Sequence, residues 1–282
     1  MSKVYFSSLL KNYACWPELE AALQELQIDY DLLEGTNDIW VRDFMPLVSP
    51  EGRYITYTYA PDYLRETPQY ITDGAKLMPY SPLIPRELDL VLDGGNMIWE
   101  GQQVILTDKI FQENKDIEMS EVIKRLGRAL DHSYLTIVPH DKNEPFGHID
   151  GMLRFVDEYT VLMTNYCDFD KPLREKMLKI LTQKFSVREL HFEVAKPHKD
   201  NWAYINYLQV GDKFILPRLN APEDELAKQQ ISRFFDVPES NIRMVDIHTI
   251  LKRGGGLNCI SWNAAQETKS SVSQVLGALL DE

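Results

Sequence analysis

Residues 253–262 read Arg-Gly-Gly-Gly-Leu-Asn-Cys-Ile-Ser-Trp. Three consecutive glycines let the backbone adopt positive φ angles and approach a bound molecule closely. Cys259 follows the last glycine by three residues and opens an apolar–polar alternation over 259–262, which predicts a short strand. A thiol at the end of such a loop is either a nucleophile or an ordinary buried cysteine, and the stretch alone leaves both interpretations open.

The same arrangement, a polar loop followed by a strand–turn–strand pattern, occurs at four earlier places. The hairpin patterns cover residues 47–59, 97–106, 152–164 and 204–217. Equivalent points of the five copies are occupied by Asp43, Asp93, His148, Tyr204 and Cys259, at intervals of 50, 55, 56 and 55 residues. A period of this size, with a strand, a hairpin and a helix in each unit, predicts radial or stacked repetition.

Amphipathic helices are predicted between the copies. Apolar residues recur at helical spacing over 17–27, 119–130, 173–185, 227–235 and 272–279. The interval 61–88 breaks this pattern, because it contains five prolines and no clear helical period. This segment is either a lid over a binding site or a loop that only covers a sheet edge, and the sequence leaves that choice open.

Reactive side chains fall at the same phase of the repeat. Five units around one axis would bring Asp43, Asp93, His148, Asp150 and Cys259 to a single central pocket. A cysteine, a histidine and carboxylates in one pocket permit nucleophilic catalysis, in which the thiolate attacks and the imidazole moves the proton. The shared phase therefore favours Cys259 as a nucleophile over a buried structural thiol.

The carboxylates restrict the substrate class. Fixed acids beside a thiolate repel anions and raise the pKa of the thiol, whereas a guanidinium group presents N–H groups that match carboxylates bidentately. The expected reaction is attack at the guanidinium carbon and loss of ammonia with a proton from His148. Water then hydrolyses the thiouronium intermediate and leaves a ureido group.

Composition excludes several other functions. The 282-residue chain is 44% hydrophobic and 26% charged, as in ordinary globular proteins, and its net charge of −13 argues against a nucleic-acid partner. Its three cysteines and six histidines show no spacing typical of a disulfide framework or a metal site, so we predict no metal. Neither a signal peptide nor an apolar run of about 20 residues is evident, which predicts a cytoplasmic protein without a membrane span.

Five short motifs carry a family resemblance. In order, they are Trp40-Val41-Arg42-Asp43-Phe44-Met45-Pro46, Asp93-Gly94-Gly95-Asn96, Gly147-His148-Ile149-Asp150 with Arg154-Phe155, Tyr204-Ile205-Asn206, and Gly254-Gly255-Gly256 before Cys259. Together they resemble the agmatine deiminase and bacterial peptidylarginine deiminase family of guanidino-group-modifying enzymes, over about residues 37–262. The resemblance implies an α/β fold, the five-bladed α/β propeller (pentein), with five ββαβ-like repeats around a central active site in a single domain, 1–282.

The resemblance also implies roles for individual residues. Cys259 would be the nucleophile, His148 the general acid and base, and Asp93 the group that orients His148. Asp43 and Asp150 would bind the guanidinium. The family implies no cofactor, a small cationic guanidinium substrate and a homodimer as a reasonable expectation.

Some positions depart from the family pattern. Phe44-Met45 replaces a usual Thr-Gly pair, Asp93 replaces a more common glutamate, and Asn258 stands where the peptidylarginine branch usually has histidine. These departures leave agmatine, free arginine and peptidyl-arginine open as substrates.

Less reactive positions have plainer interpretations. Trp40 and Trp202 are interpreted as pocket walls or core, Arg154 and Asn206 as mainly structural, and Cys15 and Cys167 as inert. The remaining rivals are an amidinotransferase with the same residues and, in a different class, a non-catalytic pentein binding protein.

Overall fold

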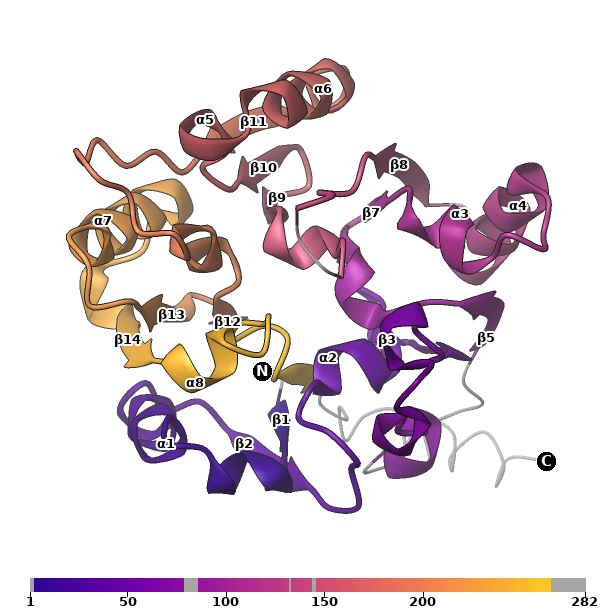
Figure 1. Ribbon diagram of the computed structural model, residues 1–282, viewed down its shortest axis with the longest axis horizontal. Helices are drawn as coiled ribbons and strands as arrows, with labels where there is room; N and C mark the ends of the chain where they lie inside the picture. The colour runs from indigo at the N-terminus through magenta and orange to yellow at the C-terminus, as the bar shows by residue number, and fades with distance from the viewer. Residues whose placement is uncertain (1–2, 79–85, 132, 144–145, 265–282) are drawn as a thin grey trace, which may run out of the picture.

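Five small sheets stand around a common axis in the computed structural model (Figure 1). The structure describes residues 3–78, 86–131, 133–143 and 146–264. Each sheet has three strands, of which the first pairs antiparallel with the middle strand and the third pairs parallel with it. This is the predicted five-fold repetition.

The sheets follow one another along the chain. They are β15 (Trp262–Ala264), β1 (Lys3–Ser7) and β2 (Tyr30–Leu33); β3 (Leu47–Val48), β4 (Tyr54–Thr58) and β5 (Arg86–Val91); β6 (Met97–Glu100), β7 (Gln103–Thr107) and β8 (Tyr134–Val138); β9 (Leu153–Asp157), β10 (Thr160–Met163) and β11 (Ser186–Glu189); and β12 (Leu208–Val210), β13 (Lys213–Arg218) and β14 (Ile242–Asp246). The last strand pairs with the first, with Trp262 opposite Tyr5, and this pairing closes the ring.

Helices form most of the crossovers between parallel strands, because a parallel pair needs a long connection. They are α1 (Trp16–Glu25), α3 (Lys109–Glu113), α4 (Met119–Ala129), α5 (Tyr166–Phe169), α6 (Lys171–Leu181) and α7 (Glu223–Phe235), and α8 (His248–Leu251) follows β14. The described part of 59–86 contains no α-helix, only the 3₁₀ turns η2 (Asp62–Leu64), η3 (Pro68–Tyr70) and η4 (Gly74–Leu77). The irregular excursion is therefore confirmed.

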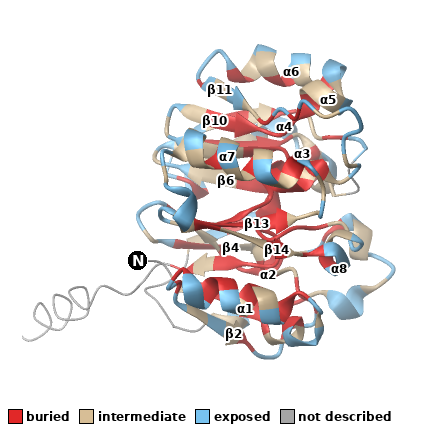
Figure 2. Ribbon diagram, turned by 90° about the vertical axis from the view of Figure 1, so that its left-hand side faces the viewer, coloured by how far each residue is buried: buried red, intermediate tan, exposed pale blue. Residues whose placement is uncertain are grey.

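The longer crossover helices bury an apolar face between their own sheet and a neighbouring sheet, as α1 does against β14 and α4 against β5, and Figure 2 shows exposed residues on their outer sides. In α4, for example, Val122 and Leu126 pack in one cluster with Val104 and Leu106 of β7, and all four are fully buried. Burial of such a side chain contributes about 1.5–3 kcal/mol. Leu126→Ala would leave a cavity and cost roughly 2–5 kcal/mol.

Two predicted strands are wrong in their position. Residues 204–208 begin in the 3₁₀ helix η7 (Asn201–Ile205), and the strand starts only at Leu208. Residues 257–260 form a turn, and the strand begins only at Trp262. In both cases a short alternation of apolar and polar residues belongs to a tight turn, where side-chain hydrogen bonds hold the backbone. The helix predicted over 272–279 lies outside the described residues.

Candidate active site

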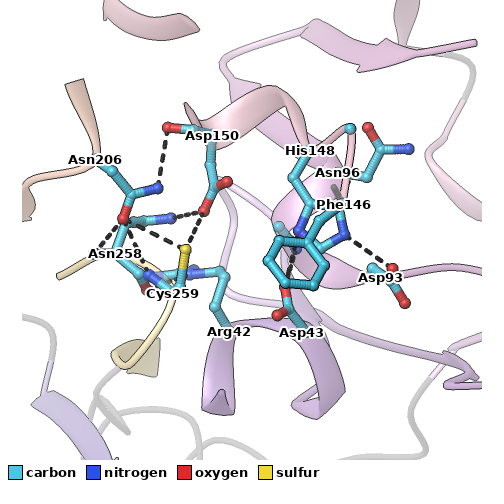
Figure 3. Close-up of polar contacts among 12 residues, drawn as sticks. Arg42, Asp43, Asp93, Asn96, Phe146, His148, Asp150, Asn206, Asn258 and Cys259 are labelled. Atoms are coloured by element: carbon cyan, nitrogen blue, oxygen red, sulfur yellow. Dashed lines mark hydrogen bonds and ion pairs between the residues drawn. The ribbon is translucent and has the colours of Figure 1, made fainter. Parts of the chain in front are cut away.

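A short helical turn precedes the first strand of each sheet and brings its polar side chains to the axis. These turns are α2 (Val41–Phe44), η5 (Gly94–Asn96), η6 (Ile149–Gly151), η7 and the turn before β15. They bring Asp43, Asp93, His148, Asp150 and Cys259 together, as the repeat phase predicted (Figure 3). Tyr204 is the exception, because its hydroxyl donates to Asp224, and Asn206 takes its place in the site.

One wall of the site surrounds the sulfur. Cys259 Sγ lies 3.6 Å from Asp150 Oδ2 and 3.4 Å from Asn206 Oδ1. The Asn206 amide oxygen also accepts from the backbone N–H groups of Asn258 and Cys259, and its amide nitrogen donates to the Asp150 carbonyl. Asn258 Nδ2 donates to Asp150 Oδ2 at 2.6 Å. Two asparagines therefore hold the sulfur and the carboxylate in fixed positions.

The opposite wall surrounds the imidazole. His148 Nε2 lies 2.8 Å from Asp93 Oδ2, and Nδ1 lies 3.5 Å from Asp43 Oδ1. The Gly95 N–H donates to the same Asp43 oxygen at 3.1 Å. The sulfur makes no hydrogen bond with the imidazole, although both residues are described. The two walls therefore face each other across the site in Figure 3.

Gly95 lies between the walls. A β-carbon at Gly95 would be 2.6 Å from Asp43 Oδ1, 3.0 Å from His148 Nδ1 and 3.4 Å from Asp150 Oδ2. Because Gly95 has no β-carbon, its backbone lies close to all three atoms, and these atoms line one small space beside Gly95. Two carboxylates around a small space match a planar cation with N–H groups on several edges.

Burial and the carboxylates set the protonation of the reactive pair. Burial, with Asp150 and Asp43 adding to it, raises the pKa of the Cys259 thiol well above its ordinary value. Burial by itself would lower the pKa of His148, but Asp43, Asp93 and Asp150 outweigh it and raise that pKa to about 10. The free site therefore holds a neutral thiol and a protonated imidazole at neutral pH.

A second group of charges lies behind Asp93. Lys109 Nζ is 3.9 Å from Asp93 Oδ2 and 3.4 Å from Glu113 Oε1, and both the Lys109 and the Glu113 side chains are buried. Burial, followed by the charge of Asp93, raises the pKa of Glu113. Lys109 also donates to the Phe146 carbonyl at 2.7 Å, which ties this group to the loop that carries His148.

Aromatic side chains pack around the site. The Phe146 ring is 4.8 Å from Tyr63 and 5.9 Å from His148 between centroids, so the 61–78 excursion reaches the histidine wall through Tyr63. Trp40 packs tightly against Gly255, where a β-carbon would come within 2.3 Å of its ring. Trp202 lies near Gly151, 3.8 Å from the corresponding point. Both tryptophans thus border loops of the site, and their part in substrate binding stays a prediction.

Arg42 lies on the other side of the nucleophile loop. Its backbone N–H donates to the Cys259 carbonyl at 3.1 Å, and Nε donates to the Asn258 carbonyl at 3.4 Å. Arg42, Arg154 and Asn258 line a cavity of about 620 Å³ among the first strands of the sheets, and Cys259 and His148 do not line it. Arg154 donates to the Tyr207 carbonyl and stacks on its ring, as its structural interpretation predicted.

Sequence reasoning missed several residues of the site. From sequence, Asn206 is interpreted as mainly structural, because polar groups in the interior need hydrogen-bond partners, and the repeat spacing points to Tyr204 two residues earlier. Gly95 had a signal in the Gly-Gly pair after Asp93, which is typical of a close backbone approach. Lys109 and Glu113 carry only the spacing of a surface ion pair on a helix, and nothing in that spacing indicates burial.

Comparisons with known proteins agree with this geometry. The model of the Porphyromonas-type peptidyl-arginine deiminase family matches residues 13–264. A Streptomyces coelicolor protein provisionally named an agmatine deiminase is 27% identical over 271 residues, which cover 83% of this chain and 78% of the relative. The agmatine deiminase of C. jejuni superposes with a TM-score of 0.70 at 18% identity, over 95% of this chain and 94% of that one.

A second solved structure has the same architecture. The agmatine deiminase of Enterococcus faecalis superposes with a TM-score of 0.73 at 16% identity, over 94% of this chain and 93% of the other. At such identities the likeness establishes the fold alone, and it confirms the five-bladed pentein. Because the family model spans nearly the whole described chain and every residue of the site, the chain belongs to the Porphyromonas-type peptidyl-arginine deiminase family.

Proposed function

We propose that the protein is a deiminase that hydrolyses the guanidinium group of agmatine, or of a closely related arginine derivative, to a ureido group and ammonia. One observation carries the proposal. Asp43 Oδ1, His148 Nδ1 and Asp150 Oδ2 all lie within 3.4 Å of the position that a β-carbon of Gly95 would occupy, and Cys259 Sγ lies 3.6 Å from Asp150. A guanidinium bound over the Gly95 backbone, between these groups, would contact both carboxylates, the imidazole and the sulfur.

Substrate binding would activate the thiol. In the free site the carboxylates disfavour the thiolate, but a bound guanidinium neutralises them and places positive charge beside the sulfur. The thiol then releases its proton to solvent. This order protects the free enzyme from unwanted thiolate reactions, because the nucleophile forms only in the complex.

The chemical steps follow from the two walls. Cys259 Sγ bonds to the guanidinium carbon, His148 gives its proton to the leaving nitrogen, and ammonia departs to leave a thiouronium. Water then attacks the same carbon and gives a proton to His148. The C–S bond then breaks, the sulfur leaves as a thiolate that takes up the hydroxyl proton of the intermediate, and the ureido product leaves with the resting thiol restored. Asp93 holds His148 through Nε2 and keeps Nδ1 directed at the space beside Gly95.

Agmatine is the first substrate to test. A curated relative is provisionally named an agmatine deiminase, and one of the solved structures with this fold is an agmatine deiminase. An amidinotransferase, with an amine in place of water, is the alternative within the same chemistry. A non-catalytic role is not favoured, because it requires none of the five aligned side chains.

Other features of the protein are proposed with this function. We infer one functional domain over 1–282, a small cationic substrate and a cytoplasmic homodimer without a resident cofactor. The described part of the chain contains no helix long and apolar enough to cross a bilayer.

Ammonia release under reducing conditions tests the proposal. Agmatine, free arginine and an arginine-containing peptide are supplied separately, and both ammonia and the ureido product are measured. With at least one substrate the two products should form in equal amounts. Adding an amine such as glycine tests transfer, because an amidinotransferase would form a new guanidine and no ureido product. If none of the three substrates released ammonia, the deiminase proposal would be overturned.

A further inference from the structure

A second group of cysteine, aspartate and histidine lies away from the axis, on the fourth sheet. Cys167 and Asp168 belong to α5, which follows β10, and His191 follows β11. Strands β10 and β11 are parallel, with Met163 opposite Glu189, so both segments leave the sheet at the same edge. The carboxyl ends of parallel strands are a common place for ligand sites.

The three ligand-type atoms form a small triangle. Cys167 Sγ is 3.3 Å from His191 Nδ1 and 3.7 Å from Asp168 Oδ1, and Nδ1 is 3.3 Å from Asp168 Oδ1. With Zn–S about 2.3 Å and Zn–N or Zn–O about 2.0–2.1 Å, the edges of a tetrahedral zinc site are roughly 3.3–3.6 Å. The triangle therefore has the dimensions of one face of such a site.

The arrangement is unlike a proton relay. In a catalytic triad the nucleophile and the carboxylate contact different nitrogens of the histidine. Here the sulfur and the carboxylate both approach Nδ1 of His191. One ring nitrogen has a single proton or lone pair in the ring plane and cannot serve both groups, whereas a cation between the three atoms would contact all of them.

Neighbouring groups hold the ligands in this orientation. Asp168 Oδ2 accepts from Asn165 Nδ2 at 3.0 Å and from the Phe192 N–H at 3.4 Å, which leaves Oδ1 directed at Cys167 and His191. The side chain of Gln230 bonds to both the N–H and the carbonyl of His191. His191 Nε2 lies 3.7 Å from Oε1 of the exposed Glu193, within ion-pair distance but beyond a hydrogen bond.

We propose that Cys167, Asp168 and His191 form a surface site for one zinc ion, or for another borderline divalent transition metal. On binding, Cys167 Sγ exchanges its proton for a bond to the metal, and the proton goes to solvent. One thiolate and one carboxylate then balance the charge of the ion. The His191 side chain is 53% exposed, so a fourth position is open to water. The proposal does not depend on the deiminase function.

Cobalt binding tests the site, because a thiolate ligand gives Co²⁺ a charge-transfer band. The Cys259→Ser variant serves as background and removes the axial thiol as a competing ligand. One equivalent of Co²⁺ should give the band, and Zn²⁺ should displace it. Cys167→Ser should abolish the band, and His191→Ala should lower the affinity for Co²⁺ at least about tenfold.

His248→Ala is the matched control, since His248 is exposed and its side chain makes no hydrogen bond or ion pair in the described structure. It should bind Co²⁺ as the background does. Zinc-soaked crystals should show an anomalous peak between Cys167 Sγ and His191 Nδ1. Absence of a stoichiometric band in the background, or an equal band in Cys167→Ser, would overturn the proposal.

Discussion

Cysteine, histidine and aspartate meet at two places in this molecule, with different results. At the axis, Cys259 and His148 stand on opposite walls and make no hydrogen bond with each other. On the fourth sheet, Cys167 and His191 are 3.3 Å apart. The first arrangement leaves room for a substrate carbon between sulfur and imidazole, and the second leaves room only for an ion. Residue types alone therefore do not define a site, because spacing decides its chemistry.

The difference has its origin in the fold. The axial residues come from separate blades, and Asp150 and Cys259 are 109 residues apart in sequence. Rigid turns at the start of each blade fix them at a distance from one another. Cys167 and His191 are 24 residues apart and follow adjacent parallel strands of one sheet, so they come into direct contact.

Removing each thiol gives the largest expected contrast. Cys259→Ala should lower kcat by at least about 10⁴-fold, because the covalent route is lost. Cys167→Ala should leave kcat within about twofold. Turnover of agmatine, with circular dichroism to check folding, measures both. Retained activity in Cys259→Ala would assign the nucleophile elsewhere.

One added methyl group at Gly95 tests the space proposed for the guanidinium. Gly95→Ala would place a β-carbon 2.6 Å from Asp43 Oδ1, so this carboxylate would have to move from the position in which it is proposed to bind the guanidinium. Because small misplacements of reacting groups are costly, we expect kcat/KM to fall about 10²-fold or more.

Gly151→Ala is the matched control for this substitution. It is also a glycine beside the site, but a β-carbon there would meet only Trp202 at an ordinary distance of 3.8 Å. It should retain activity within a fewfold. Equal losses in the two variants would mean that the space at Gly95 is not the binding position.

The repeat phase accounts for what the sequence could predict. Asp43, His148 and Cys259 recur at nearly equal intervals, and a propeller turns equal intervals into proximity. The sequence did not predict Asn206 in the site, because the 3₁₀ turn η7 shifts the site position of this repeat by two residues. The burial of Lys109 and the contact of Cys167 with His191 were not predicted either. Burial and the pairing of parallel strands are properties of the assembled fold, and local sequence patterns do not indicate them.

Neutralising Asp93 should shift the pH dependence of the axial site. The pKa of His148 is raised from 6.5 to about 10, in part by its hydrogen bond to Asp93. Loss of a charged hydrogen bond of roughly 1.5–3 kcal/mol corresponds to about 1–2 pKa units. In Asp93→Asn the imidazolium thus loses its proton at lower pH, and the alkaline limb of kcat/KM moves to lower pH.

A surface aspartate controls for the change of charge. Asp89 pairs with Arg125, and its side chain is 82% exposed, so Asp89→Asn should leave the profile unchanged. An alkaline limb that stays in place in Asp93→Asn would show that Asp93 does not tune His148. The affinity of the site formed by Cys167, Asp168 and His191 for Co²⁺ should be the same in both variants.

The buried charges behind Asp93 give the smallest expected effect on activity and a clear one on stability. Lys109→Met leaves Glu113 without its cation, whereas Asp93 keeps His148, and breaking a buried ion pair costs about 3–5 kcal/mol. Because the pKa of Glu113 is already raised, protonation of Glu113 should keep the loss near the lower limit. Activity should fall by about tenfold or less, since Lys109 contacts neither substrate nor sulfur.

The same substitution at an exposed ion pair provides the comparison for stability. Lys76 pairs with Asp73 and its side chain is 81% exposed, so Lys76→Met should leave the free energy of unfolding in urea nearly unchanged. The double variant Lys109→Met with Glu113→Gln should recover part of the loss, because it removes the unpaired acid. Equal unfolding free energies for Lys109→Met and Lys76→Met would mean that the axial site does not depend on buried charge behind its histidine.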